Sequence, residues 1–198
     1  MREIDIRKSL NHKVLSLFHD EQDMIVINEF GICQGEARID LAVINGFIHG
    51  FEIKSENDTL ERLPSQQEAY NKVFDTVTIV TGDKYINKVT DRIPNWWGIM
   101  RARQKGKKVV LEAIRECHDN PKVDPFYLAQ LLWQSEAIAI LEKYKLAKGL
   151  RNKPRRYVWS ALAQNIPVQQ LSELIRETLK KRESLKSRYN LRVALPQK

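Results

Sequence analysis

The sequence predicts an α/β fold, an α/β/α sandwich with a central mixed sheet, followed by a basic α-helical C-terminal region. Three observations lead to this prediction. Helix-like and strand-like segments follow one another as helix, three strands, helix and strand up to about residue 116. Only helical segments follow residue 121, and the excess of positive charge lies there. We therefore expect two domains, residues 1–116 and residues 122–198.

The first domain begins with a helix over residues 5–18, where apolar residues recur at helical spacing. A strand over residues 24–30 follows. Two more strands, residues 38–43 and 47–54, flank the turn-forming Asn45-Gly46. The remaining expected elements are a helix over residues 64–74, a buried strand over residues 76–81 and a strand pair over residues 97–102 and 108–114.

The second domain is predicted to be helical. Residues 124–145 carry apolar residues at helical spacing and predict one helix. Residues 148–156 form a basic connector. Helix, turn and helix are then expected over residues 160–164, 165–167 and 168–181.

The composition is that of an ordinary soluble globular protein, with 42% hydrophobic and 29% charged residues in a chain of 198. No apolar run is long enough to span a bilayer, and the N-terminus is charged rather than signal-like. Cys33 and Cys117 match neither a zinc nor a disulfide pattern. We therefore expect a cytoplasmic protein that has no membrane partner.

Side-chain parity decides whether Asp40 and Glu52 can share a site. Side chains alternate between the faces of a strand, and opposed residues of an antiparallel pair share a face. A two-residue Asn45-Gly46 loop would place the two carboxylates on opposite faces. A three-residue loop over residues 44–46, with Gly46 in the left-handed conformation, places both carboxylates and Lys54 on one face.

The same three-residue loop gathers apolar side chains on the other face of the hairpin. It opposes Val43 to Phe47 and Asp40 to Gly50. The apolar face then consists of Ile39, Leu41, Val43, Phe47, His49, Phe51 and Ile53. Burial of this face and assembly of the charged group require one register, so we expect the loop of odd length.

Two carboxylates and a lysine on one face of a hairpin predict a metal site. Mg²⁺ prefers carboxylate oxygens, waters and substrate phosphates as ligands, and a neighbouring lysine can hold or deprotonate a water molecule. Asp40, Glu52 and Lys54 would provide these groups. Unpaired charges at the end of an apolar strand would be costly without such a site. A salt-bridge cluster of the same three residues is the structural alternative.

Gln66 and Tyr70 lie four residues apart on the next predicted helix and therefore share a face. The order Asp40, Glu52, Lys54, Gln66, Tyr70 resembles the PD-(D/E)XK nuclease superfamily. The hairpin is similar to its Asp…Glu-x-Lys core, and the helix to the Gln-x-x-x-Tyr motif of its RecB-like, Holliday-resolvase-like branch. The resemblance covers roughly residues 1–116 and extends to a bacterial and phage family of mostly uncharacterised proteins. Ile39 stands where the superfamily usually has proline.

This resemblance implies a restriction-endonuclease-like sandwich and a Mg²⁺-dependent phosphodiesterase, with Mn²⁺ able to substitute. Asp40 and Glu52 would bind the metal, and the backbone carbonyl of Ile53 would be a further ligand. The metal would lower the pKa of a bound water and neutralise phosphate charge. Lys54 would orient that water or help to deprotonate it, while Gln66 and Tyr70 would position nucleic acid or water.

A further carboxylate usually precedes the hairpin in this superfamily. Glu29 is the preferred candidate because it ends a strand just before the site. Glu3 on the first helix and Glu36 beside Arg38 are competitors. A capping or solvent-facing role would explain Glu29 equally well.

The net charge of +8 is unevenly distributed. Residues 122–198 contain 16 Lys and Arg against 6 Asp and Glu, whereas residues 1–121 contain 17 against 19. A basic surface attracts polyanions because phosphate contacts release condensed counterions. A solubilising charged surface explains the same composition.

A basic segment in the second domain is the candidate nucleic-acid surface. Residues 143–156 contain seven basic residues and no acid, and Tyr157 and Trp159 follow directly. Basic groups hold phosphates, while aromatic rings stack on exposed bases. The residues expected to bind nucleic acid are Lys148, Arg151, Lys153, Arg155 and Arg156.

These expectations describe a metal-dependent nuclease that hydrolyses phosphodiester bonds, with DNA as the first candidate substrate. The alternative is a nuclease-like fold that docks on nucleic acid or on a partner without cutting. A transcription-factor-like protein that uses the C-terminal helices is a third interpretation. Phage replication, DNA repair and anti-phage defence all fit, and the oligomeric state stays open, with a homodimer as one candidate.

Overall fold

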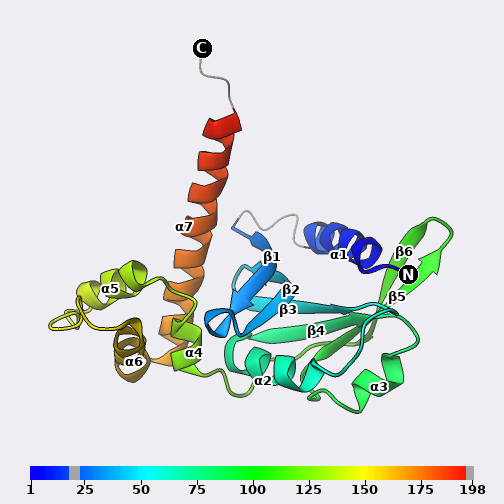
Figure 1. Ribbon diagram of the computed structural model, residues 1–198, viewed down its shortest axis with the longest axis horizontal. Helices are drawn as coiled ribbons and strands as arrows, with labels where there is room; N and C mark the ends of the chain where they lie inside the picture. Colours follow the sequence, from blue (N-terminus) through cyan, green and yellow to red (C-terminus); the bar gives the residue numbers. More distant parts are fainter. Residues whose placement is uncertain (18–22, 195–198) are drawn as a thin grey trace. The chain divides into compact units, whose positions relative to one another are not determined.

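The computed structural model describes residues 1–17 and 23–194. The chain divides into two compact units, Met1–Val123 and Asp124–Lys198, which are coloured blue to green and green to red in Figure 1. Phe18, the last residue of the first predicted helix, lies outside the described residues. Within the described ranges, no helix is long and apolar enough to cross a membrane.

The N-terminal unit is built on a six-stranded mixed sheet, so the predicted α/β class with a mixed sheet is confirmed. The strands lie in chain order, and β3–β4 and β4–β5 are parallel while the other neighbours are antiparallel. They are β1 (Ile25–Ile32), β2 (Ala37–Ile44), β3 (Ile48–Lys54), β4 (Thr76–Thr81), β5 (Gly98–Lys105) and β6 (Lys108–Arg115).

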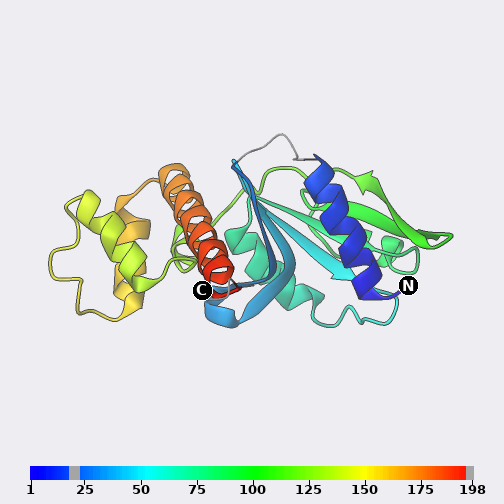
Figure 2. The ribbon, with the colours of Figure 1, turned by 90° about the horizontal axis from the view of Figure 1, so that it is seen from above.

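Helices pack on both faces of this sheet (Figures 1 and 2). On one face, α1 (Glu3–Leu17) buries Ile6, Leu10 and Val14 in a core that includes Leu41 and Val43. This helix forms because its apolar residues recur every four positions. On the other face, α2 (Leu63–Val73) begins beside Pro64, a residue whose fixed φ suits a first helical turn.

The layer around α2 is aromatic. The Tyr70 ring stacks on Trp97 with centroids 6.0 Å apart and meets Phe74 edge-on at 5.7 Å, and Phe74 also contacts Phe30. The smaller elements of this unit are a 3-10 turn, η1 (Cys33–Gly35), and α3 (Ile86–Thr90). The ring of Tyr70 is therefore held in place by packing against Phe74 and Trp97.

The hairpin loop has three residues, as the parity argument required, but it lies one residue further along than predicted. The sheet pairs Ile44 with Ile48 and Ala42 with Gly50, so the loop is Asn45–Phe47 rather than residues 44–46. The Asn45 side chain accepts from the Phe47 N–H at 3.0 Å, which closes this turn. The expected left-handed Gly46 is also wrong, since its φ is not positive. The predicted pairings of Val43 with Phe47 and of Asp40 with Gly50 are therefore wrong by two residues, since Val43 pairs with His49. A change of two residues preserves the parity.

The predicted apolar face is wrong at Ile39. Leu41, Val43 and Ile53 do belong to the core under α1. Ile39 instead lies against Gly50 and Phe74 on the face of α2, because a Cβ added to Gly50 would lie 2.5 Å from Ile39 Cδ1. Strand alternation therefore reverses between Ile39 and Leu41, at Asp40. Of the remaining residues expected on this face, Phe47 is exposed and His49 is half-buried.

The same reversal occurs in the neighbouring strand. Val26 packs toward the core under α1, whereas Phe30, four residues later, contacts Phe74 on the other face. Between them, Glu29 has φ 53°, in the left-handed region. Glu29 and Asp40 are opposed in the β1–β2 register, which pairs Asn28 with Leu41 and Phe30 with Ile39. In both strands, the side chains therefore change faces at the position of the acid, Glu29 in β1 and Asp40 in β2.

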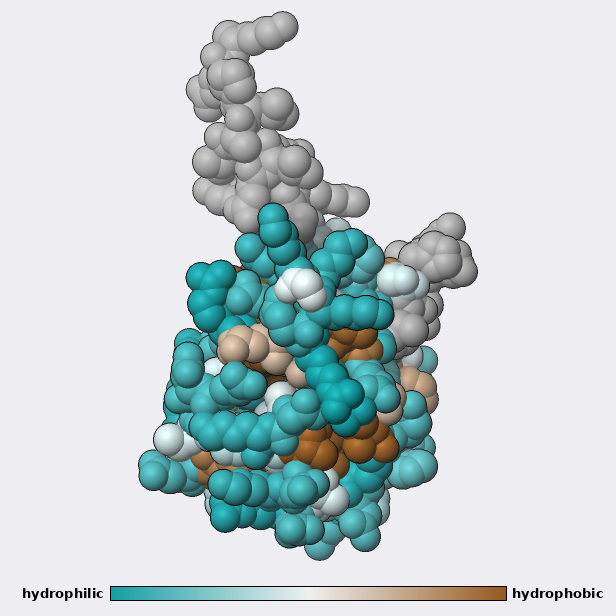
Figure 3. Space-filling view, turned by 90° about the vertical axis from the view of Figure 1, so that its right-hand side faces the viewer, coloured by the Kyte–Doolittle hydropathy of each residue, from teal (hydrophilic) through white to brown (hydrophobic). Residues whose placement is uncertain are grey.

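At one edge of the sheet β6 pairs with β5, and arginines of β5 form ion pairs with a carboxylate of β6 and with one that follows β4. Arg101 contacts Glu112 at 2.6 Å, and Arg103 contacts Asp83 at 3.1 Å. The face of the molecule in Figure 3 is mostly hydrophilic, with smaller hydrophobic areas between the polar residues. Charged pairs on an edge strand hinder pairing with other chains.

The C-terminal unit is helical, with α4 (Pro125–Ala129), α5 (Gln134–Lys143), α6 (Arg155–Asn165) and α7 (Val168–Ala194). The predicted helix, turn and helix correspond to α6, Ile166-Pro167 and α7. The single helix predicted over residues 124–145 is wrong, because it is broken between α4 and α5. At the break, side chains donate hydrogen bonds to backbone carbonyls: Arg182 donates to the Leu131 carbonyl and Trp159 to the Leu132 carbonyl.

Candidate functional site

A pocket of about 820 Å³ opens beside Asp40 and the end of β3. Its lining includes all the predicted site residues of the N-terminal unit except Tyr70, which lies behind Glu52: Glu29, Asp40, Glu52, Ile53, Lys54 and Gln66. Both competitors for the third acid, Glu3 and Glu36, also line it. Segments that are far apart in the sequence therefore contribute to one cavity.

Glu52 and Lys54 form a buried ion pair at the end of β3, since Lys54 Nζ lies 2.7 Å from Glu52 Oε1. The two residues are 3% and 4% exposed. Gln66 links them, because its Nε2 donates to Glu52 Oε1 at 2.7 Å and its Oε1 accepts from Lys54 Nζ at 2.9 Å. A buried ion pair is weak evidence for stability, because the cost of desolvating both charges offsets their attraction.

Tyr70 completes the network around Glu52. Its hydroxyl oxygen lies 2.7 Å from Glu52 Oε2 and 2.8 Å from the Arg38 carbonyl, and it accepts from Gln66 Nε2 at 3.2 Å. The single hydroxyl proton can serve only one of its two acceptors at a time. Burial, and then the charge of Glu52, raise the pKa of Tyr70 well above its ordinary value, so the hydroxyl group stays protonated and remains a donor.

Asp40 has a different set of partners. Its Oδ2 accepts from the Ile53 N–H at 2.6 Å, and its Oδ1 lies 2.7 Å from Arg7 Nη2. The β2–β3 pairing ends at Leu41 and Phe51, so the Asp40 carboxylate takes the donor that the strand backbone would otherwise use. The bond to Ile53 brings the carboxylate next to Glu52.

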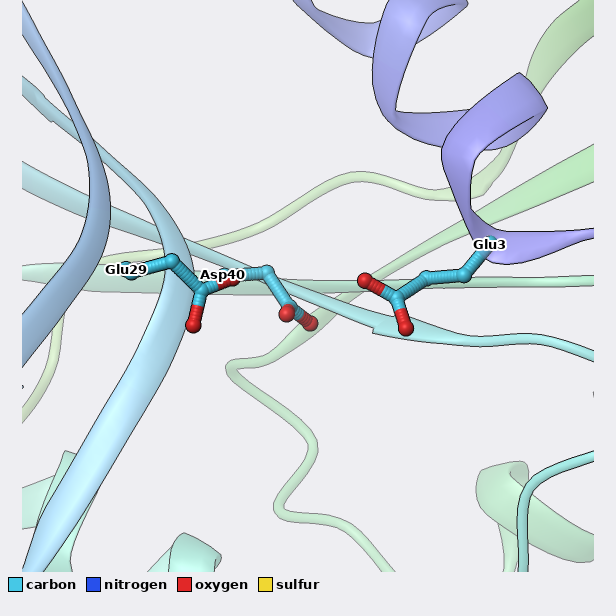
Figure 4. A group of neighbouring side chains, drawn as sticks. All are labelled: Glu3, Glu29 and Asp40. Carbon is cyan, nitrogen blue, oxygen red and sulfur yellow. The ribbon is translucent and has the colours of Figure 1, made fainter.

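Asp40 also belongs to a group of three acids. One carboxylate oxygen from each of Glu3, Glu29 and Asp40 lies within 4.8 Å of the others. Figure 4 shows the three side chains converging from α1, β1 and β2. Glu52 is not a member of this group, so the structure places Asp40 between two sets of charges rather than in one set of predicted ligands.

Arg7 lies at the centre of the three acids. Its Nη2 is 2.5 Å from Glu3 Oε1, 2.7 Å from Glu29 Oε1 and 2.7 Å from Asp40 Oδ1. Burial lowers the pKa of Arg7, but the hydrogen bond to Glu3 and the charges of Asp40 and Glu29 outweigh it, and the net shift is upward. The positive charge of the Arg7 guanidinium group thus offsets the negative charge of the three carboxylates.

The sequence reasoning missed Arg7. A signal was present, because Glu3 and Arg7 are four residues apart and share a face of α1. Of the three candidates for the further acid, Glu29 and Glu3 both join Asp40, whereas Glu36 lines the pocket outside this group. The capping role considered for Glu29 is not what the structure shows, since its carboxylate pairs with Arg7 and Arg38. Its side chain is exposed, as the solvent-facing alternative expected.

The backbone of Glu29 is strained. A left-handed conformation costs a residue with a Cβ about 1 kcal/mol or more relative to glycine. Strain of this kind persists where the surrounding structure enforces it, and it is common at functional sites. Here it directs the Glu29 side chain toward Asp40 (Figure 4).

The carboxylates around Asp40 are oxygen donors, the kind of group that could hold a hard divalent cation. Burial, and then the negative charge of Glu52, raise the pKa of Asp40 to about 6 from its ordinary value of 3.8. The bond from the Ile53 N–H and the charge of Arg7 act in the opposite direction but do not restore the ordinary value. Burial is thus the main reason why Asp40 holds its proton more tightly than a free aspartate does, and the charge of Glu52 adds to it.

The basic residues predicted to bind nucleic acid are all exposed on the C-terminal unit. Lys148 and Arg151 line a hollow of about 380 Å³, and Arg151 pairs with Glu142 at 2.6 Å. Lys153 precedes α6, and Arg155 and Arg156 form its first turn rather than a connector. Trp159 is buried and cannot stack on a base, contrary to the expectation from the sequence.

The sequence matches a family of phage proteins. Residues 1–195 match the family described as Bacteriophage P4 protein cII. Protein cII of Enterobacteria phage P4 is 28% identical to this chain over 160 residues, which are 81% of the chain and 60% of the phage P4 protein. The chain thus spans about 60% of the length of that relative.

Among solved structures, a protein of unknown function from Silicibacter pomeroyi matches with a TM-score of 0.43 and 15% identity, over 75% of this chain and 97% of that one. The family match, in contrast, extends over almost the whole sequence. This protein belongs to the family of bacteriophage P4 protein cII.

Proposed function

We propose that this protein is a metal-dependent nuclease that hydrolyses phosphodiester bonds, with DNA as its substrate and Mg²⁺, replaceable by Mn²⁺, as its cofactor. The resemblance of Asp40, Glu52, Lys54, Gln66 and Tyr70 to the PD-(D/E)XK superfamily supports this function. Helices on both faces of a mixed sheet are compatible with the restriction-endonuclease-like sandwich that the resemblance implies.

One observation carries the proposal. The Asp40 carboxylate is bonded to the Ile53 N–H, and Ile53 lies between Glu52 and Lys54 in one pocket. Two acids and a lysine are therefore adjacent at an opening large enough for a phosphodiester group. Buried charges that add little to stability are retained where they have a chemical role.

The residues have distinct roles in this proposal. Asp40, Glu52 and the Ile53 carbonyl would hold the metal, with Glu29 or Glu3 as a further ligand. A bound metal would lower the pKa of a water molecule and offset phosphate charge. Lys54 would orient the attacking water, and Gln66 and Tyr70 hold Glu52 and Lys54 in place through the hydrogen bonds described above.

The test is a nuclease assay of the purified full chain on supercoiled, linear, single-stranded and branched DNA, with Mg²⁺, Mn²⁺ or EDTA. We expect cleavage that requires metal. Asp40→Asn and Glu52→Gln should abolish it, and Lys54→Met should reduce it by roughly 100-fold or more. Asp83→Asn is the matched control, because Asp83 is an exposed acid that pairs with Arg103. Full activity in the three site variants would defeat the proposal.

The alternative function is a nucleic-acid-binding or partner-docking module that does not cut. The position of Arg7 favours it, because a guanidinium group already compensates Glu3, Glu29 and Asp40. This alternative predicts no cleavage of any DNA form with either metal. It also predicts that Mg²⁺ does not change the thermal stability of the protein.

A further inference from the structure

Among the residues of the C-terminal unit whose side chains the structure describes, two aromatic side chains are exposed. Trp133, at the start of α5, is 56% exposed, and Tyr157, in the first turn of α6, is 46% exposed. Burial of a large aromatic side chain is favourable, so exposed rings forgo that stabilisation. The other aromatic residue considered for base stacking, Trp159, is buried.

Trp133 is held in place by a network of charged groups. Its backbone N–H donates to Glu136 Oε2 at 2.8 Å. The Arg182 guanidinium group lies over the indole ring, 4.3 Å from its centroid, and this contact is a cation–π interaction. Arg182 is anchored in turn by Glu136 and by the Leu131 carbonyl. The exposed ring is therefore ordered before any partner arrives, which reduces the entropy cost of binding.

The residue that follows Trp133 contacts the basic segment. Gln134, the first residue of α5, donates from Nε2 to the Lys153 carbonyl at 3.0 Å, so the starts of α5 and α6 are adjacent. Arg156 covers the Tyr157 ring at 4.8 Å and donates to its hydroxyl group at 2.9 Å. Each exposed aromatic ring is thus paired with an arginine, and Tyr157 lies in the same helical turn as Arg155.

We infer that Trp133 and Tyr157, with Lys153, Arg155 and Arg156, form a binding surface for single-stranded DNA. The bases would stack on the two rings, and the basic side chains would contact the phosphates. Duplex DNA cannot use the rings in this way, because its bases are already stacked on one another. The inference names the form of nucleic acid and rests on the proposed nucleic-acid binding, but not on the metal chemistry.

The positive charge of this surface favours a polyanion as its partner. Residues 143–156 contain seven basic residues and no acid. Glu142, the neighbouring acid, is paired with Arg151, and Glu136 is paired with Arg182. The surface therefore presents rings and positive charge together, a combination that matches exposed bases linked by phosphates.

The test is a binding assay by fluorescence anisotropy with the full chain in EDTA. The probes are fluorescein-labelled oligothymidylate, oligouridylate and a DNA duplex of the same length. We expect tighter binding of oligothymidylate than of duplex. Trp133→Ala should weaken oligothymidylate binding by about 5- to 150-fold, since each stacked base contributes about 1–3 kcal/mol. Trp133→Phe should retain most of the affinity, and Tyr157→Ala should weaken it in the same direction.

Two matched variants complete the design. Phe47→Ala removes an equally exposed aromatic ring from the N-terminal unit and should leave binding unchanged. Lys153→Ala should weaken the binding of both DNA forms and reduce its salt dependence, whereas Trp133→Ala should leave the salt dependence as it is. If Trp133→Ala does not fold, as judged by circular dichroism, Trp133→Leu and Tyr157→Ala decide.

Three results would overturn the inference. The first is oligothymidylate binding within about twofold of wild type in both aromatic variants. The second is equal weakening of single-stranded and duplex binding by Trp133→Ala, and the third is binding of oligouridylate but not of oligothymidylate. Because cleavage is blocked in EDTA and only binding is read, failure here is distinguishable from failure of the proposed nuclease activity.

Discussion

The Arg7 guanidinium group contacts Asp40 twice, with Nη2 2.7 Å from Oδ1 and Nη1 donating to the backbone carbonyl at 2.8 Å. The two residues are 33 positions apart and lie on different elements, α1 and β2. Arg7 therefore fixes the first helix against the strand that supplies the central acid. It also supplies positive charge at the point where a divalent cation would bind three carboxylates.

Replacing Arg7 tests this relationship. Arg7→Met should lower stability in EDTA by about 2 kcal/mol, because it leaves the partly buried Asp40 carboxylate, with the exposed Glu3 and Glu29 beside it, without a compensating cation. Mg²⁺ should restore much of the loss, so the rise in Tm on adding Mg²⁺ should be larger in the variant than in wild type. Differential scanning fluorimetry with and without Mg²⁺ measures both effects.

The matched control for this variant is Arg103→Met, which removes an exposed arginine paired with Asp83. Its Tm should change little and should not depend on Mg²⁺. Equal behaviour of the two arginine variants would show that Arg7 does not share its position with a divalent cation.

The raised pKa of Asp40 predicts how stability depends on pH. The folded protein holds the Asp40 proton up to about pH 6, whereas the unfolded chain releases it near 3.8. The contribution of protonated Asp40 to stability is thus fully present below about pH 4 and is lost as the pH rises through about 6, on the order of 2 kcal/mol in EDTA. Urea unfolding across this range measures the effect, and Asp40→Asn should flatten it.

Metal binding should have the opposite pH dependence, because only the ionised carboxylate is a ligand. The rise in Tm on adding Mg²⁺ should be larger at about pH 7.5 than at about pH 5. A rise that is the same at both values, or that persists in Asp40→Asn, would argue against Asp40 as a ligand.

Two substitutions at Glu29 distinguish the effect of backbone strain from the effect of losing the carboxylate. Glu29→Gly and Glu29→Ala both remove the carboxylate and should weaken metal binding equally. The glycine variant should be more stable than the alanine variant by about 1 kcal/mol, because glycine adopts φ 53° without a steric penalty. Chemical denaturation of the two variants gives this difference.

Glu36 provides the comparison, since its φ of −64° is an ordinary helical value. There the order should reverse, and Glu36→Ala should be more stable than Glu36→Gly. A glycine variant at position 29 that is no more stable than the alanine variant would mean that the left-handed conformation at Glu29 stores no strain.

Gly50 tests the reversal of strand alternation at Asp40. Gly50→Ala should lower stability by about 1–3 kcal/mol, because the new Cβ would meet Ile39 Cδ1 at 2.5 Å and the Phe74 ring at 3.1 Å. Trimming the obstructing group in Gly50→Ala/Ile39→Val should recover part of the loss. Gly46→Ala is the control, since nothing lies within 4 Å of its added Cβ, and a loss of equal size there would contradict the expectation.

The sequence alone determined the order of the elements and much of the site. Hydrophobic periodicity predicted the six strands and the helices α1 and α2, and the parity of the hairpin predicted a loop of odd length. Buried Glu52 and Lys54, with Gln66 and Tyr70 beside them, lie in one network as their spacing suggested. These features depend on neighbours within a few residues, and such local geometry is fixed by backbone period.

Tertiary structure decided which acids meet and what compensates them. The left-handed turn of β1 at Glu29 reverses strand alternation, and docking of α1 brings Glu3 and Arg7 to Asp40. Neither follows from periodicity, because both depend on contacts between residues that are tens of positions apart in the chain. The break between α4 and α5 has the same cause, since its carbonyls bond to Trp159 and Arg182 from later helices. Hydrophobic periodicity describes neighbours along the chain, so it does not predict hydrogen-bond partners that come from distant segments.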